Sequence, residues 1–355
     1  MDPLTHALLG ATAAQAALGH RLGRQAWLPG ALGGLLPDAD ILIRSTADPL
    51  LAIEYHRHFT HAFAFIPVGG VVAASPWLVQ RRYRADWRPL LAAATIGCAT
   101  HGLLDACTNY GTHLLWPFST LRVAWHWLTT IGPLLTLALL AGLLLAVRRQ
   151  SRLPAVLSLS FALVYVGVAA WQRERALDLQ ELIAAARGHP VVRAEMFPSV
   201  GNPVVWRSVY QSGTTLYSDR LRVVDSAGSL WKPGSTLELL FAADLPPAAA
   251  ADARVQRDFA RFSYFSSGWT ALSDSDASVI GDARYSLSRD SFEPIWGIRF
   301  HPGSATPTEW VDQTARNRVP VGELWREIRG TADGYRGLPT AGRVDAVAVA
   351  RDSGC

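Results

Sequence analysis

The amino-acid sequence predicts a mainly α-helical membrane bundle followed by a β-rich (α+β) soluble domain. Half of the 355 residues are hydrophobic and only 17% are charged, whereas soluble proteins average about 25% charged residues. Long apolar segments fill the chain as far as Trp171, and short alternating runs separated by turn residues begin near Val191. We therefore expect a transmembrane helical bundle over residues 1–171, an amphipathic connecting helix over 172–189 and a β-rich domain over 190–355.

The membrane part contains six apolar segments of two kinds. Two of them, residues 7–18 and 27–43, are short and rich in Ala and Gly. Because these residues allow helices to approach closely, the two segments either pack inside the membrane bundle or lie partly outside it. The start of the chain lacks the basic region of a signal peptide, so we expect it to be retained. Four segments have about the length and apolar composition that a bilayer span requires: 62–79, 89–107, 128–147 and 153–171.

The remainder of the chain predicts one amphipathic helix and then strands. QRERALDLQELIAAARGHP has apolar positions at helical spacing and ends at a Gly and a Pro. LPPAAAADAR indicates a loop with a helix starting after it. Short runs bounded by turn residues predict strands, namely RLRVVDSAG, STLELLFAA, RFSYFSSGW and IWGIRFHPG.

Arginine positions predict the orientation in the membrane. Short loops at alternate ends of the apolar segments contain Arg21, Arg24, Arg81, Arg82, Arg84, Arg88, Arg148, Arg149 and Arg152. Positively charged loops favour the cytoplasmic side. The loops over residues 44–61 and 107–127 and the C-terminal domain then lie on the opposite face, which is the periplasm of a Gram-negative cell. The net charge of +4 does not indicate a nucleic-acid partner.

With this topology, ionisable residues gather at the outer ends of the apolar segments. A carboxylate at membrane depth costs at least roughly 2.5 kcal/mol and needs a partner, and a mixture of His and Asp suits zinc or another first-row metal ion. His101 and Asp105 are four residues apart, so both lie on one face of a helix. The predicted metal ligands are His6, Asp38, Asp40, His56, His61, His101 and Asp105.

The other histidines fit this site less well. His58 points away from His56 if the stretch is helical, and His113 and His126 lie in the outer loop beside the site. We expect surface or capping roles for His20, His189 and His301.

Five motifs in order resemble the YdjM-like family of membrane-bound metal-dependent hydrolases: MDPLTHALLGA, GGLLPDADIL, YHRHFTHA, HGLLDACTNYGTHLLWPFS and FPSVGNPVVWR. The resemblance implies that the same seven residues bind metal. The order of His and Asp residues is also similar, more distantly, to zinc-dependent phospholipase C and P1-type nucleases. Two positions depart from the family pattern: Gly132 stands where Asp is expected before Pro133, and His58 stands where Gly is common.

Together these observations predict a multi-pass hydrolase of the bacterial inner membrane. We expect one or more zinc ions to activate water for the cleavage of a phosphoester or an ester. The expected substrate is a membrane lipid or a lipid-linked molecule. Arg57 is a candidate to hold an anionic substrate group, because a guanidinium matches phosphate geometry. Asp38 and Asp40 are candidates for the general base. The sequence does not define an oligomeric state.

Two other classes of function remain open. In one, the membrane half binds metal or haem without hydrolysis, as a transporter or sensor does. The mixture of His with Asp argues against haem, and no inverted repeat indicates a transporter. In the other, the membrane half is an anchor and the β-rich domain does the binding through its aromatic residues, which include Trp206, Trp231, Trp269, Trp296 and Trp310.

Overall fold

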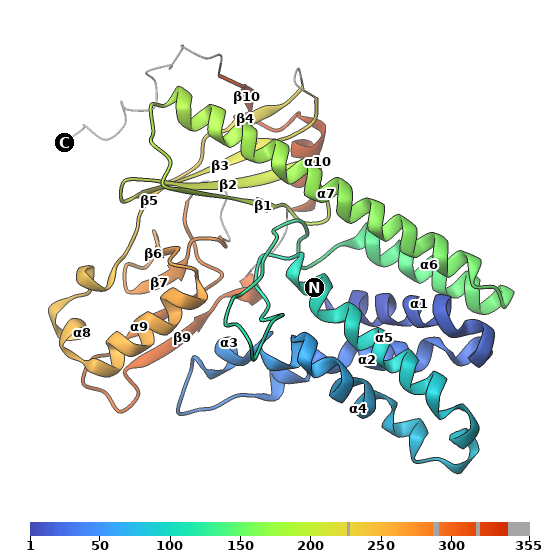
Figure 1. Cartoon of the computed structure of the whole chain (residues 1–355). Coiled ribbons are helices and arrows are strands. Elements are labelled where there is room, and N and C mark those ends of the chain that lie inside the picture. The colour runs from blue at the N-terminus through green and yellow to red at the C-terminus, as the bar shows by residue number, and fades with distance from the viewer. Residues whose placement is uncertain (226–227, 287–290, 317–319, 340–355) are drawn as a thin grey trace, which may run out of the picture. The chain divides into compact units, whose positions relative to one another are not determined.

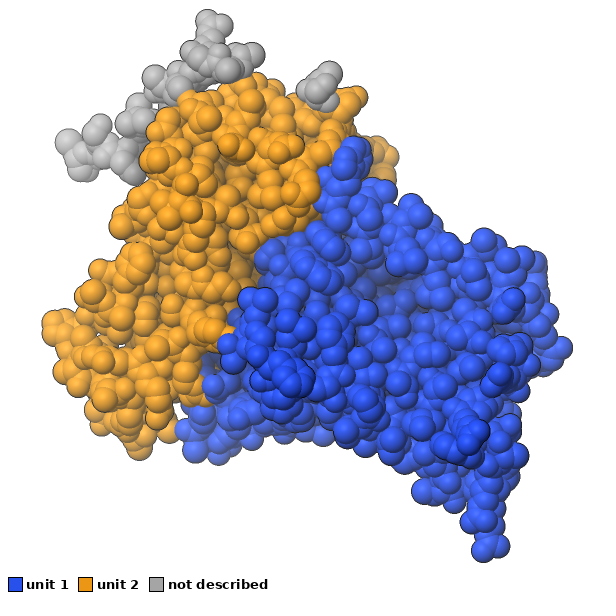
Figure 2. Space-filling model, in the orientation of Figure 1, with its two compact units in different colours: residues 1–171, 200–203 blue, residues 172–199, 204–355 orange. Residues whose placement is uncertain are grey.

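The computed structural model describes residues 1–225, 228–286, 291–316 and 320–339 (Figure 1). Its contacts divide the chain into two units (Figure 2). The first unit comprises residues 1–171 with 200–203, and the second comprises the rest. The first unit is helical and the second is built on antiparallel sheets. The predicted order of a helical region followed by a β-rich region is therefore confirmed.

Among the described helices, α2 and α7 begin at the predicted residues, whereas α1 and α5 begin earlier and α4 and α6 begin later than the predicted apolar segments. Asp2 caps α1 by accepting from the backbone N–H of Thr5, and Pro3 occupies the first turn, so the helix is longer than the apolar run 7–18. α6 begins only at Pro133. The helices are α1 (Pro3–Leu22), α2 (Trp27–Leu35), α3 (Leu51–Tyr55), α4 (Ile66–Leu78), α5 (Trp87–Ala106), α6 (Pro133–Arg149) and α7 (Leu153–Ala186). Short 3₁₀ turns cover Gly23–Gln25, Leu36–Leu42, Phe59–His61, Phe63–Phe65 and Arg81–Asp86.

Glycines bring α1, α2 and α5 into backbone contact. A Cβ atom added at Gly97 of α5 would lie 2.0 Å from the carbonyl oxygen of Gly30 in α2. A Cβ atom at Gly34 would lie 2.4 Å from the carbonyl oxygen of His6 in α1. Only glycine permits this approach, as the Ala- and Gly-rich composition predicted. It places His6 of α1 beside the end of α2 and so helps to assemble the site described below.

Among the described helices, α7 is the one that is long and apolar enough by itself to cross a membrane. α4 has 13 residues and α6 has 17, which correspond to about 20 and 26 Å at 1.5 Å per residue. Both are shorter than a hydrocarbon core of about 30 Å. The segments Leu51–His61 and Phe63–Leu78 would supply a second span if this pair, bent by 62°, is counted as one. The multi-pass topology therefore stays a prediction.

The apolar segment 153–171 and the amphipathic segment 172–189 form one helix in the structure. α7 continues through Trp171 to Ala186, since no Gly or Pro lies between Val168 and Ala186, and Gly188 follows with a φ of +72°. α7 therefore spans the boundary between the two units.

The second unit contains two antiparallel sheets. One has the order β1-β2-β3-β4-β10 with β5 also paired to β3, and the other has the order β6-β7-β8-β9. The first sheet consists of β1 (Arg193–Pro198), β2 (Val205–Ser212), β3 (Thr215–Arg222), β4 (Leu230–Lys232), β5 (Thr236–Glu238) and β10 (Arg336–Gly337). The second consists of β6 (Thr270–Leu272), β7 (Val279–Asp282), β8 (Trp296–Phe300) and β9 (Thr308–Asp312). Besides the C-terminal part of α7, the described residues of this unit form the helices α8 (Pro247–Ala251), α9 (Ala253–Phe265) and α10 (Val321–Arg329).

The first sheet buries both of its faces. Trp206 and Leu221 pack with Ile183 of α7, which lies across the sheet (Figure 1). Val209 and Leu216 point to the other face and pack with Trp269. Alternation along each strand therefore separates two cores.

One predicted strand is a helix. The run RFSYFSSGW begins inside α9, which continues to Phe265. The buried residues Val255, Phe259 and Phe262 recur with Phe265 at helical spacing, so the apolar face extends further back than the run that suggested a strand.

Candidate metal centre

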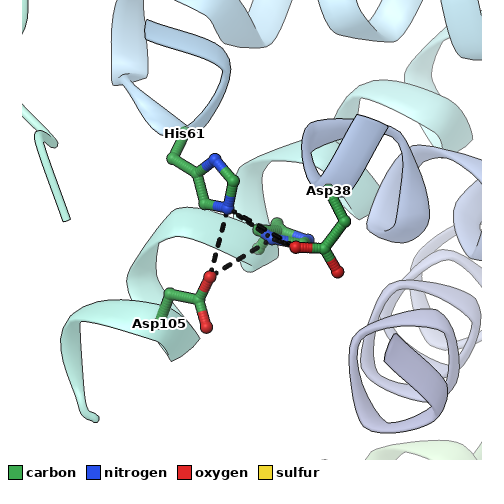
Figure 3. Close-up of side chains that lie close together, drawn as sticks. Asp38, His61 and Asp105 are labelled. Carbon is green, nitrogen blue, oxygen red and sulfur yellow. Dashed lines mark hydrogen bonds and ion pairs between the residues drawn. The ribbon is translucent and has the colours of Figure 1, made fainter. Parts of the chain in front are cut away.

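Four of the predicted ligands meet at one point in the first unit. Asp38, His61, His101 and Asp105 each offer one ligand atom, and these atoms all lie within 4.8 Å of one another. His101 and Asp105 come from successive turns of α5, and Asp38 and His61 come from two 3₁₀ turns. Figure 3 shows the labelled side chains pointing toward a common centre.

The distances between these atoms suit a single tetrahedral metal ion. Asp105 Oδ2 lies 3.2 Å from His61 Nε2 and 3.3 Å from His101 Nε2. Asp38 Oδ1 lies 3.4 Å from His101 Nε2 and 3.7 Å from His61 Nε2. The two Nε2 atoms are 2.9 Å apart. Zinc bonds of about 2.0–2.1 Å in tetrahedral geometry require ligand atoms about 3.3 Å apart.

The hydrogen bonds behind the two imidazoles direct their lone pairs to this centre. His101 Nδ1 lies 2.6 Å from the carbonyl oxygen of Gly34, which can only accept, so Nδ1 carries a proton and the neutral ring presents Nε2 as an acceptor. His61 Nδ1 lies 3.0 Å from Thr60 Oγ1, which donates in turn to Asp40 Oδ2. Four acceptor atoms therefore face one another, an arrangement that a cation stabilises.

The other three predicted ligands lie behind the four. His6 Nε2 is 3.0 Å from Asp105 Oδ1, and its ring stacks on His101 with 3.7 Å between centroids. Asp40 Oδ2 is 3.4 Å from His61 Nδ1. His56 Nδ1 is 3.0 Å from Asp40 Oδ1. The structure thus connects all seven residues, four around the centre and three supporting them.

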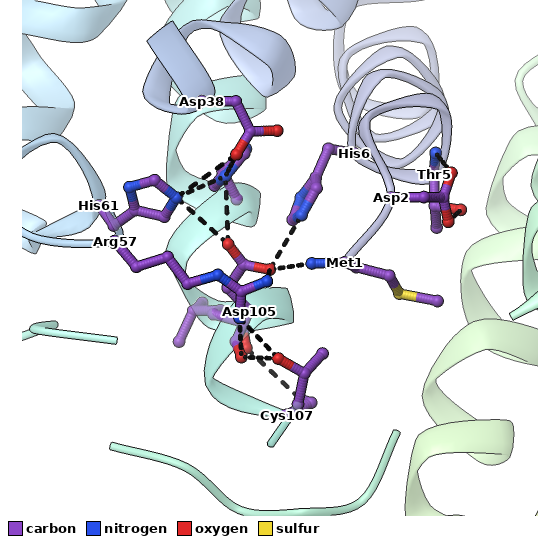
Figure 4. Close-up of polar contacts among 12 residues, drawn as sticks. Met1, Asp2, Thr5, His6, Asp38, Arg57, His61, Asp105 and Cys107 are labelled. Carbon is purple, nitrogen blue, oxygen red and sulfur yellow. Dashed lines mark hydrogen bonds and ion pairs between the residues drawn. The ribbon is translucent and has the colours of Figure 1, made fainter. Parts of the chain in front are cut away.

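Arg57 lies inside this network. Its side chain is 5% exposed, and its Nη2 lies 3.1 Å from Asp105 Oδ1 while its Nη1 donates to Thr108 at 2.7 Å. Figure 4 shows the guanidinium and the amino group of Met1 approaching the same carboxylate. The guanidinium is thus positioned to hold Asp105 in place.

The backbone of Arg57 is also held. Its φ of +62° is unusual for a residue with a side chain and costs of order 1–3 kcal/mol. Its N–H donates to Asp40 Oδ2 at 2.8 Å, and its carbonyl accepts from the N–H of His113. These two contacts maintain the strained turn between His56 and His61.

Several groups in the network were not predicted from the sequence. The Met1 amino group, the Gly34 carbonyl, Thr60 and Thr108 contact the seven residues or Arg57. Gly33 and Gly34 in an apolar run were the available signal for a close backbone approach. The others depend on tertiary contacts that no spacing shows.

His58, His113 and His126 lie outside the group of four. The ring of His58 is 4.7 Å from that of His113. Burial, with His58 and Arg122 nearby, lowers the pKa of His113 to about 4. His126 Nδ1 lies 3.3 Å from Asn109 Oδ1. His113 is therefore neutral at physiological pH.

The position of Asp40 predicts a graded effect on metal binding. We expect Asp40→Asn to weaken metal affinity by about 10–100-fold, because Asp40 orients His61 without being among the four ligands. Competition with a chelating indicator measures the change. Asp86→Asn, an exposed residue before α5 that makes no side-chain cap, is the matched control. Equal affinity in the two variants would contradict the supporting role.

The comparisons with known proteins identify the helical half. The family model described as YdjM inner membrane protein matches residues 1–176. This range contains all seven predicted ligands. Neither the search of curated proteins nor that of solved structures found a match. The distant similarity to phospholipase C and P1-type nucleases therefore stays a prediction.

Proposed function

The chain belongs to the YdjM inner membrane protein family, as its motifs predicted, and on this premise we propose that it is a metal-dependent hydrolase of the inner membrane. The observation that supports the proposal is the convergence of four acceptor atoms from Asp38, His61, His101 and Asp105. Asp105 and both histidines are buried and Asp38 is partly buried, and a carboxylate held in such a place is costly unless cations accompany it.

We propose zinc as the ion. Two imidazoles and two carboxylates form a donor set that suits zinc or a neighbouring first-row metal. When bound, such an ion lowers the pKa of water to about 7 and so supplies a nucleophile at neutral pH. Asp38, His61, His101 and Asp105 would hold it, with Gly34 and Asp40 fixing the imidazoles.

Asp38 is the better candidate for the general base. Asp40 has both carboxylate oxygens occupied, by His56 on one side and by Arg57 N–H and Thr60 on the other. Asp38 Oδ2 is buried without a hydrogen-bond partner, and the Asp38 side chain as a whole is 23% exposed, whereas the side chains of the other three ligands are closed to solvent. An oxygen of this kind is available to accept a proton from water.

Arg57 has two proposed roles. Its contact with Asp105 supports a positioning role, since the guanidinium holds one carboxylate oxygen and leaves Oδ2 directed at the centre. To bind an anionic substrate group as predicted, the Arg57 guanidinium must release Asp105 in part and contact the substrate instead.

A lipid-linked phosphoester is the proposed substrate. The loop after α5 exposes Leu115, Phe118 and Leu121, with Phe118 91% exposed. Within the same loop, Trp116 lies 5.8 Å from His58, next to Arg57. Exposed apolar side chains beside a polar site suit a lipid chain with its polar group at the centre. We also propose that the site and the C-terminal domain face the periplasm, as the arginine pattern predicts.

One observation favours a second candidate function. Catalytic zinc sites keep a position open, whereas four protein ligands complete a tetrahedron. A closed site would suit metal binding without hydrolysis, as in a transporter or sensor. Hydrolysis requires the more exposed ligand, Asp38, to yield its place or the coordination to expand.

A combined measurement tests the proposal. We expect detergent-purified protein to contain zinc, and to hydrolyse a phosphodiester from a panel of model and lipid-linked esters. Chelation should abolish hydrolysis and added zinc should restore it, while His101→Ala loses both metal and activity. Metal without hydrolysis would favour the second candidate. The absence of metal from the wild-type protein would refute both.

A further inference from the structure

Two arginines face each other across strands of the first sheet in the second unit. Arg207 of β2 is directly opposite Arg220 of β3, so both side chains project from the same face. Like charges placed directly opposite destabilise a sheet. Arg222, two residues along β3, adds a third cation on this face and donates to the carbonyl oxygens of Ile328 and Gly228.

Arg207 has little compensation for its charge. Its Nε donates to Ser218 Oγ at 3.1 Å, but its Nη1 is buried without a hydrogen-bond partner. Within the described parts of the chain, the ion pairs include none for Arg207. Burial, with Arg220 adjacent, lowers the pKa of Arg207 to about 10. A cation in this position is costly unless an anion accompanies it.

The neighbouring carboxylates pair with arginines other than Arg207. Asp282 interacts electrostatically with Arg207, but it forms a buried ion pair with Arg284 at 2.6 Å. Glu327 of α10 lies 3.3 Å from Arg220 Nε and also accepts from Tyr335. One carboxylate therefore serves Arg220, and Arg207 stays uncompensated.

We propose that Arg207 and Arg220 form a binding site for a phosphate group. Ser218 Oγ and Ser199 Oγ accept from the two guanidinium groups, the latter at 3.4 Å, and each hydroxyl retains its own proton to donate to an anion. A tetrahedral phosphate takes donors from several directions, whereas a single guanidinium satisfies a planar carboxylate. Arg207 is partly buried and the Arg220 side chain is 15% exposed, so part of each side chain reaches solvent, whereas Arg207 Nη1 itself is buried.

This site lies in the second unit and does not depend on the proposed hydrolase activity. Free phosphate and the phosphate of a lipid headgroup share the required chemistry. Inorganic phosphate and phosphatidic acid in detergent, used as separate probes, distinguish these sources.

The experiment uses calorimetry and thermal unfolding of the detergent-purified full chain. We expect saturable binding of at least one probe by the wild-type protein, and binding weaker by about tenfold or more in Arg207→Met. Arg257→Met is the matched control, because the Arg257 side chain is 65% exposed in α9 of the same unit. Its affinity should equal that of the wild-type protein.

Folding of the variant is checked in the absence of probe. An apolar replacement for an unpaired buried cation is expected to leave the melting temperature equal or higher, and the wild-type protein alone should gain stability on adding the probe. If Arg207→Met does not fold, Arg220→Gln provides the same comparison. Binding of neither probe by the wild-type protein, or equal binding by wild type and the folded arginine variant, would overturn the proposal.

Discussion

Asp105→Asn is expected to remove the bound metal and to destabilise the first unit. The substitution removes one of the four ligands and the negative charge beside the other three. Affinity should therefore fall by more than the roughly 100-fold that the loss of a supporting residue produces. It also leaves Arg57 buried without its ion partner, and breaking a buried pair costs about 3–5 kcal/mol.

Two measurements separate these effects. Elemental analysis reports the metal, and thermal unfolding of chelator-treated protein reports the ion pair without the contribution of metal. Asp86→Asn is again the control, because it makes the same chemical change at an exposed position. Retention of full metal content by Asp105→Asn would eliminate the proposed centre. An unchanged melting temperature would show that Asp105 does not compensate the charge of Arg57.

The proximity of His101 and Asp105 could be predicted from the sequence, because it depends only on the geometry of one helix. His101 and Asp105 lie one turn apart in any regular helix, and α5 confirms the helix. Asp38 and His61 instead lie in 3₁₀ turns, and their positions depend on where those turns pack. The spacing therefore could not divide the seven residues into four around the centre and three behind it. The division depends on tertiary contacts, such as those of the Gly34 carbonyl with His101 and of Asp40 with His61.

The fold, too, could be predicted only in part from the sequence. Apolar composition located the helices, but their ends depend on local groups, such as the Asp2 cap of α1 and Pro133 at the start of α6. A change from apolar to amphipathic composition at Trp171 suggested a new element, yet composition does not end a helix without a Gly, a Pro or a cap. The arginine pair of β2 and β3 required the register of two strands, which the sequence does not specify.

Asp282→Asn is expected to produce the largest loss of stability in the second unit. Asp282 is fully buried and holds Arg284 through contacts of 2.6–3.1 Å. Asparagine keeps the shape but removes the carboxylate that pairs with the buried Arg284 guanidinium, and breaking a buried pair of this kind costs about 3–5 kcal/mol. For a unit of this size, that loss lowers the melting temperature by roughly 6–20 °C.

Asp276→Asn is the control that tests whether burial of the ion pair causes the loss of stability. Asp276 also pairs with an arginine, at 2.7 Å from Arg299, but its side chain is 44% exposed, and exposed pairs contribute little. A large effect at Asp282 and a small one at Asp276 would assign the cost to burial, whereas equal effects would refute that assignment. The metal content of Asp282→Asn should match that of the wild-type protein, because all four ligands belong to the first unit. A parallel loss of metal would instead mean that the β-rich domain helps to build the centre.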